Sequence, residues 1–262
     1  ATVDTISNKR LVLGLGTSSQ PLVEDFHGDK FEKPLKRMKE YVEIIRSILS
    51  GKTINYSGEI FSLKNFSLLI KPPRDTIPIY LAAVNQKMVE LTWEIADGVI
   101  LTSNADPVTM KWRLEQIEKG AEKAGRDPND IDVWARGMIY VTDQNDDQKA
   151  RHQVCGYAVN GAIEVIRLLR RKSPEVEELR KRMEKAEPGL IDQCQKVYDA
   201  FDPKWLEHVD APAANLITDD ILKAQQFLGK PEDICEHIEK LKEIGVKPIL
   251  IKVFMYALNI LS

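Results

Sequence analysis

The 262-residue chain has few of the residues that build disulfide frameworks and metal centres. Its three cysteines (Cys155, Cys194 and Cys235) are widely spaced and odd in number, which argues against a disulfide framework and fits a reducing cytoplasm. Its four histidines have none of the spacings that are typical of zinc ligands. We therefore expect no metal site.

Long apolar runs and an excess of one charge are also missing. No uncharged apolar run is long enough to span a bilayer, and the first ten residues lack the basic-then-apolar pattern of a signal peptide. The net charge of −3 at pH 7 gives no general attraction to nucleic acid. These absences predict a cytoplasmic protein that has a small-molecule substrate and neither nucleic acid nor membrane as a partner.

Short apolar segments alternate with amphipathic helices along much of the chain. Pro34 suits a first helical position, and apolar residues at helical spacing predict a helix from Pro34 to Leu49. Asp106-Pro107 predicts the start of a helix that ends near Gly125. Strands are expected at 11–15, 78–83, 98–102, 131–141 and 248–253, whereas 52–76 looks irregular and 145–228 contains no convincing strand. This alternation indicates a parallel sheet, in either a doubly wound fold or a (β/α)8 barrel.

The stretch "RLVLGLGTSSQP", residues 10 to 21, has the glycines of a strand-ending turn. A dinucleotide-binding loop needs a third glycine and a helix that begins at once. Here Thr17-Ser18-Ser19 replaces the third glycine, and the next helix starts only at Pro34. The pattern disfavours a Rossmann site and leaves a tight packing turn as the alternative to a ligand loop.

Three predicted strand ends finish in small or hydroxyl residues. They are Thr17-Ser18-Ser19, Ala82-Ala83-Val84-Asn85 and Thr102-Ser103-Asn104. In a parallel α/β protein all three ends emerge on the side where ligands bind. Small residues let a phosphate and a flat ring approach the backbone, so the three loops together predict a phosphorylated cofactor.

Several segments resemble the bacterial luciferase-like superfamily of flavin and deazaflavin oxidoreductases. "SNKRLVLGLGTSS" is similar to its strand-four signature, "IPIYLAAVNQKMVELTWEIADGVILTS" to its strand-five and strand-six segment, and "GKPEDICEHIEKLKEIGVKPILI" to its closing helix and strand eight. The middle segment is the most specific of the three. Its residue pattern is most similar to that of the branch that uses coenzyme F420, an 8-hydroxy-5-deazaflavin, such as the methylenetetrahydromethanopterin reductases.

The resemblance implies a TIM (β/α)8 barrel formed as a single domain over residues 1–262, with a helical insertion at about 145–228. The five strands would be strands four to eight, and strands one to three would lie before Ala1. It implies a homodimeric oxidoreductase that transfers a hydride between F420 and a small organic substrate. An FMN-dependent monooxygenase and a non-catalytic cofactor-binding paralogue are the alternatives.

The resemblance also assigns site residues. Those carried over to the cofactor are Thr17, Ser18, Ala83, Val84, Asn85, Thr102 and Ser103, and the catalytic residues stay unassigned. Ser18 stands where the family has glycine, and Ser19 stands where its sugar-phosphate dehydrogenases have an acid, which argues against a glucose-6-phosphate dehydrogenase. Ser19 is instead a candidate substrate contact.

Charged side chains outside these loops have two interpretations each. Arg136 lies in an apolar strand, where it either contacts the substrate or pairs with a helix carboxylate on the outer face. The basic run 167–172 either meets an anionic cofactor tail or forms a solvated helix face. Glu24, Asp25 and His27 either transfer protons or belong to a solvated loop.

Overall fold

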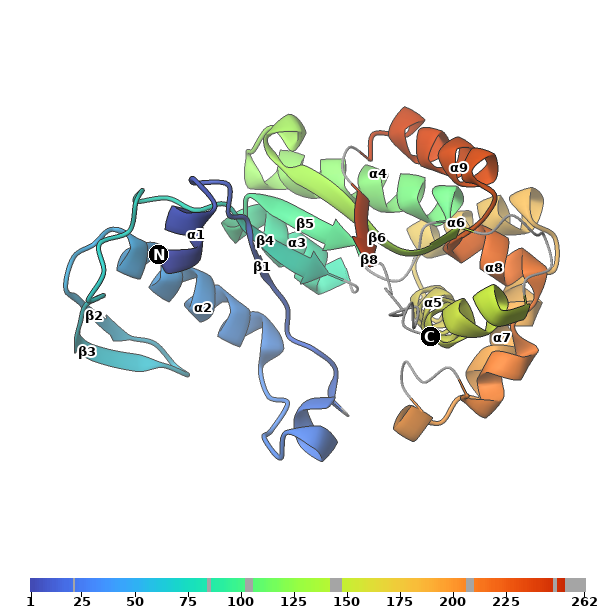
Figure 1. Ribbon diagram of the computed structural model, residues 1–262, viewed down its shortest axis with the longest axis horizontal. Helices are drawn as coiled ribbons and strands as arrows, with labels where there is room; N and C mark the ends of the chain where they lie inside the picture. The colour runs from blue at the N-terminus through green and yellow to red at the C-terminus, as the bar shows by residue number, and fades with distance from the viewer. Residues whose placement is uncertain are drawn as a thin grey trace, which may run out of the picture. The chain divides into compact units, whose positions relative to one another are not determined.

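The computed structural model describes residues 1–20, 22–83, 86–101, 106–141, 148–205, 210–246 and 249–252 (Figure 1). The chain divides into two compact units. The first comprises residues 1–100 and 117–133, and the second comprises residues 101–116 and 134–262. No helix in the described part of the chain is both long enough and apolar enough to cross a membrane.

Parallel strands form the centre of the first unit. Strand β4 (Ile79–Ala83) lies between β1 (Leu13–Leu15) and β5 (Gly98–Leu101), and β1 runs parallel to β4. Helix α3 (Gln86–Ile95) connects β4 to β5 and packs against α2 (Pro34–Leu49). The side chains of β4 alternate, because Ile79, Leu81 and Ala83 are fully buried whereas Ala82 is partly exposed on the other face.

The turn before β5 ties several elements of the first unit together. One carboxylate oxygen of Asp97 accepts hydrogen bonds from Arg46 of α2 at 2.9 Å and from the backbone N–H of Ile79 at 2.8 Å. The Asp97 carbonyl accepts from the N–H of Asp132 at 3.2 Å. A Cβ on Gly98 would come 2.8 Å from the Tyr80 ring, so this position requires glycine.

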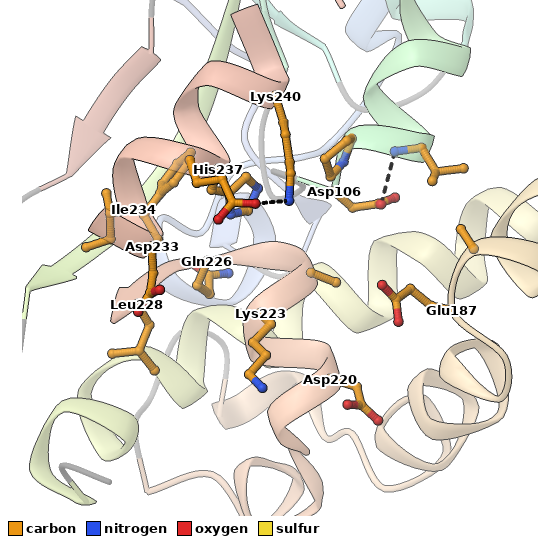
Figure 2. A pocket seen from close by; sticks show the side chains of 16 residues that line it. Asp106, Glu187, Asp220, Lys223, Gln226, Leu228, Asp233, Ile234, His237 and Lys240 are labelled. Carbon is orange, nitrogen blue, oxygen red and sulfur yellow. Dashed lines mark hydrogen bonds and ion pairs between the residues drawn. The ribbon is translucent and has the colours of Figure 1, made fainter. Parts of the chain in front are cut away.

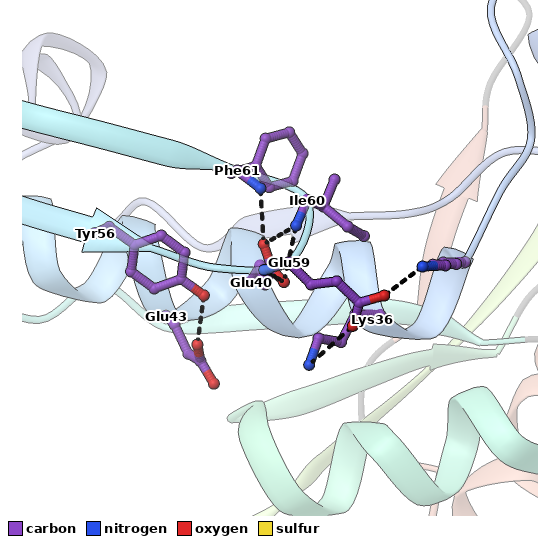
Figure 3. A network of polar contacts seen from close by, with 8 residues as sticks. Lys36, Glu40, Glu43, Tyr56, Glu59, Ile60 and Phe61 are labelled. Carbon is purple, nitrogen blue, oxygen red and sulfur yellow. Dashed lines mark hydrogen bonds and ion pairs between the residues drawn. The ribbon is translucent and has the colours of Figure 1, made fainter.

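An antiparallel hairpin, β2 (Ile54–Ser57) and β3 (Ser62–Phe66), occupies part of the segment that was predicted to be irregular, so that prediction was wrong. Figure 3 shows the polar contacts that hold the turn of this hairpin. The Glu40 side chain of α2 accepts the turn N–H groups of Glu59, Ile60 and Phe61 at 2.9, 3.1 and 2.9 Å. Burial raises the pKa of Glu40, but these three donors outweigh it and hold the pKa below its usual range.

The second unit contains residues 134–141 of β6 (Asp132–Val141), which pairs in parallel with β7 (Phe227–Gly229) and with β8 (Ile249–Lys252). The expectation of no strand at 145–228 was wrong at its end, where β7 begins. The helices of this unit enclose an apolar core. They are α5 (Gln148–Leu169), α6 (Pro174–Ala186), α7 (Leu190–Asp199) and α8 (Asp219–Gln225). Helix α9 (Pro231–Glu243) packs against β7. Helix α4 (Pro107–Ala124) is shared between the units, and short helices α1 (Thr2–Ile6) and η1 (Leu22–Phe26) lie near the N-terminus.

Candidate functional site

The carboxyl ends of β1 and β4 lie side by side in the first unit. Leu15 pairs with Leu81, so Thr17 follows at the level of Ala83. A Cβ on Gly16 would be 3.2 Å from the Cβ of Ala82, which makes this a close approach of two strands with little side-chain bulk. The structure therefore confirms the prediction that these two strand ends lie together. Gly16 and Ala82 lie on the same face of the sheet there. The sequence places Ala82 in this strand end but assigns it no contact with a ligand, although the alternation along β4 puts it on that face.

The residues after β1 have unusual surroundings. Ser18 is exposed and has φ +61°, in the left-handed region that favours glycine, which is the residue that the resembling motif has at this place. The Ser19 Oγ is buried and has no hydrogen-bond partner among the described residues. A buried hydroxyl without a partner can bind a ligand without giving up an existing hydrogen bond. The Thr17 hydroxyl donates to the Ser18 carbonyl at 3.4 Å.

Two of the three residues predicted for proton transfer, Glu24 and Asp25, lie in a short helical turn. Glu24 lies in the π-helical turn η1, and its carboxylate accepts hydrogen bonds from the Gln20 side chain at 2.8 Å and from the Phe31 N–H at 3.2 Å. The solvated-loop interpretation is correct that Glu24 and Asp25 are exposed. It is wrong that the segment is a loop, because both residues lie in the helical turn η1. These bonds give Glu24 a structural role at the turn.

Two helix N-termini at the strand ends differ in charge. At α4, Asp106 is buried and its carboxylate accepts from the N–H groups of Val108 at 3.1 Å and Thr109 at 2.8 Å. This carboxylate occupies the end where an anion would bind. Helix α3 has no acidic residue in its first turn, so its N-terminus carries no competing negative charge. Of the two, α3 is the helix that suits a phosphate.

Four predicted cofactor residues lie outside the described residues. They are Val84, Asn85, Thr102 and Ser103. Ala83 is the last residue of β4 and is fully buried on the face opposite Gly16, so it presents only its backbone to a ligand.

Arg136 lies in β6 of the second unit, where Arg136 pairs in register with Leu250 of β8. It is half-buried, as is Trp134 two residues earlier, whereas Val133 and Ala135 are buried on the opposite face. The guanidinium makes no hydrogen bond or ion pair with any residue in the described ranges. The predicted pairing with a helix carboxylate is thus not seen there, and the substrate interpretation stays a prediction.

A pocket of about 430 Å³ in the second unit was not predicted (Figure 2). Its walls are the start of α4, the end of α6, α8, β7 and α9. Polar groups of both signs line it, and Lys240 is paired with Glu236 at 2.8 Å, while the His237 ring lies 4.8 Å from the Phe227 ring. The sequence gives only a weak signal for this pocket, because one of its walls is β7, a strand of three residues. Among the described residues no group of three His, Cys, Asp or Glu side chains is placed to hold a metal ion.

Comparison with known proteins agrees with the resemblance. A family model described as luciferase-like monooxygenase matches residues 1–247. The chain is 32% identical over 249 residues to a 5,10-methylenetetrahydromethanopterin reductase of Archaeoglobus fulgidus, covering 95% of this chain and 69% of that protein.

Solved structures agree as well. One is the coenzyme F420-dependent tetrahydromethanopterin reductase from Methanopyrus kandleri, with a TM-score of 0.70 and 23% identity over 97% of this chain and 71% of that one. Another is an F420-dependent secondary alcohol dehydrogenase, with a TM-score of 0.69 and 21% identity over 97% of this chain and 67% of that one. At these identities the structures establish the fold, and the predicted luciferase-like α/β barrel class is confirmed.

Proposed function

Since the chain belongs to the luciferase-like monooxygenase family, we propose that it is a coenzyme F420-dependent oxidoreductase that acts on a small organic substrate. The observation that carries the proposal is the 32% identity, over nearly the whole chain, to a 5,10-methylenetetrahydromethanopterin reductase, and a relative that is 30% identical over 161 residues is named as a coenzyme F420-dependent oxidoreductase. When bound, the deazaflavin supplies the chemistry by accepting or donating a hydride. The protein holds the cofactor, orients one face of its ring and excludes water.

The described residues at the strand ends fit such a group. The close approach of Gly16 to Ala82 leaves a surface with little bulk, against which a flat ring can lie. The buried Ser19 hydroxyl, which the sequence predicts as a substrate contact, has no partner among the described residues; because it directly follows Thr17 and Ser18, we propose that it also hydrogen-bonds the cofactor. The phosphate binds at the N-terminus of α3, which has no acidic residue in its first turn. The groups proposed to hold it are the backbone of Ala83, Val84 and Asn85 before the helix, and Thr102 and Ser103 after β5. Thr17 and Ser18 face the ring, and Arg136 contacts the substrate.

An FMN-dependent monooxygenase is the second candidate, because the matching family model carries the name of that activity. Parallel titrations of the purified protein with F420 and with FMN, followed by fluorescence quenching, separate the two. We expect saturable binding of F420 and none of FMN at the same concentrations. Binding of FMN alone would replace the proposal with the monooxygenase. Binding of neither would refute both and leave a paralogue without this cofactor.

Two variants test the site itself. Ser19→Ala removes the buried hydroxyl, and Ser67→Ala is the matched control because Ser67 is exposed and makes no hydrogen bond with the described residues. We expect weaker F420 binding in the first variant and unchanged binding in the second. Gly16→Leu places bulk on the ring surface and should abolish binding while the thermal transition stays cooperative. Unchanged affinity in both Gly16→Leu and Ser19→Ala would remove the strand ends as the site.

The proposal also includes a homodimer that works in the cytoplasm. Analytical ultracentrifugation measures the first property and cell fractionation measures the second.

A further inference from the structure

The turn between α5 and α6 carries a pocket with an excess of positive charge. The pocket has a volume of about 550 Å³, which is within the range of small-molecule sites. Its charged lining residues are Arg170, Arg171, Lys172, Arg180 and one carboxylate, Glu177. The pocket lies wholly within the second unit.

Two of the cations are fixed by contacts of their own. The Arg170 guanidinium donates to the Tyr198 hydroxyl at 2.9 Å and lies 4.1 Å from the centre of that ring. Arg180 donates to the Leu169 carbonyl at 2.8 Å, and its Nε is 3.5 Å from Glu177. Both guanidinium groups are therefore held at the pocket before any ligand arrives.

The other two cations of the lining are Arg171 and Lys172. The side chains of Arg171 and Lys172 make no hydrogen bond or ion pair with residues in the described part of the chain. The only carboxylate in the lining, Glu177, is already beside Arg180. Arg170, Arg171 and Lys172 thus have no carboxylate partner among the described residues, whereas Arg180 has Glu177.

A buried arginine outside the lining interacts electrostatically with Arg171. Arg113 of α4 is 5% exposed, and its Nη1 has no hydrogen-bond partner among the described residues. Burial lowers the pKa of Arg113. The charges of Glu164 and Asp106 oppose this shift, whereas the nearby charge of Arg171 adds to it. Glu164 is itself paired with Arg167 at 3.0 Å. An anion bound at Arg171 would therefore relieve repulsion between two arginines.

We propose that this pocket binds a small molecule with two or more phosphate or carboxylate groups. Guanidinium groups suit such ligands because their N–H donors match the geometry of oxyanions. The N-terminus of α6 also lies at this pocket, but its first turn carries Glu175 and Glu177, so the guanidinium and ammonium groups supply the attraction and the helix dipole does not. The pocket is distinct from the strand ends, and the proposal does not depend on the F420 assignment.

Isothermal titration calorimetry with tripolyphosphate and, separately, with citrate tests the proposal on the whole chain. We expect one site for at least one of the two probes, with affinity that falls as salt is added. Tighter binding of tripolyphosphate assigns phosphate as the ligand group, and tighter binding of citrate assigns carboxylate. No measurable binding of either probe at millimolar concentration would overturn the proposal.

Paired variants distinguish a site from a general charge effect. Arg171→Gln/Lys172→Gln removes the two unpaired cations of the pocket. Lys181→Gln/Lys185→Gln removes the same charge from exposed positions of α6 outside it. Neither pair makes a side-chain hydrogen bond or ion pair with the described residues, so both variants should fold. We expect at least a tenfold loss of affinity in the first variant and less than twofold in the second. Equal losses in both would show nonspecific charge attraction and refute the pocket.

Discussion

The contact between Gly137 of β6 and Phe227 of β7 allows a quantitative test of how the second unit is packed. A Cβ on Gly137 would lie 2.6 Å from Cδ2 of Phe227 and still closer to its Cε2, well inside the 3.4 Å at which ordinary contact begins. Phe227 is only 1% exposed and cannot turn into solvent. Gly137→Ala therefore forces the ring, or the strand that carries it, to move.

The expected magnitude follows from this overlap. Overfilling a well-packed core usually costs about 1–3 kcal/mol, and an overlap of this size belongs at the upper end, about 3 kcal/mol. Phe227→Ala alone should cost about 3–5 kcal/mol because it leaves a cavity. In the double variant the added methyl group has no ring to meet. Its cost should then be close to that of Phe227→Ala, so the two effects should not add.

Urea denaturation of the wild type, both single variants and the double variant measures the coupling. Gly14→Ala is the control, because a Cβ there meets Ile100 at an ordinary 3.4 Å and should change the free energy of unfolding by less than about 0.5 kcal/mol. A Gly137→Ala variant as stable as the control, or costs that add in the double variant, would show that β6 and β7 do not pack as described.

Three further predictions concern single residues. Ser18→Gly should raise the free energy of unfolding by about 0.5–1 kcal/mol. It removes left-handed strain of about 1–2 kcal/mol from the folded state, and part of this gain is offset because glycine gives the unfolded chain more conformational entropy. A lower free energy of unfolding, measured by urea denaturation, would contradict this. Asp106→Ala should cost about 1–2 kcal/mol by uncapping α4, whereas Asp106→Asn should keep most of the stability, and equal losses would argue against a capping role. Burial, with the charge of Asp106, raises the pKa of the Cys194 thiol to about 12, so the unfolded chain loses this proton first and stability should fall as pH rises from about 9 toward 12. Thermal midpoints measured over that range should fall less steeply in Cys194→Ala, and parallel curves for the two proteins would refute the assignment.

Local signals predicted the helices well. Pro34 at the first helical position and the apolar spacing that follows it are properties of one segment, and α2 has the predicted bounds. The hairpin β2–β3 depends on a different kind of information. Its turn is held by Glu40, which is distant in the sequence, and no local pattern reports that contact. Strand β7 was missed because three residues carry too little periodicity.

The site was predictable only in part. The small residues at the strand ends indicated where a ligand approaches, and the pairing of β1 with β4 brings two of those ends together. The conformation of Ser18 and the unpaired Ser19 hydroxyl depend on backbone geometry and packing, which residue types alone do not specify. The cofactor residues Val84, Asn85, Thr102 and Ser103 stay predictions.

The turn at Ala96-Asp97-Gly98 explains why a sequence motif can identify a family without identifying a reaction. Asp97 joins α2 to the first residue of β4, and Gly98 makes room for Tyr80. These constraints act at the amino ends of the strands, whereas ligands approach the carboxyl ends. A substitution in the loops at the other end can therefore change the substrate without disturbing this turn. Relatives collected by this motif should share an ancestor and an architecture, and their reactions have to be determined one by one.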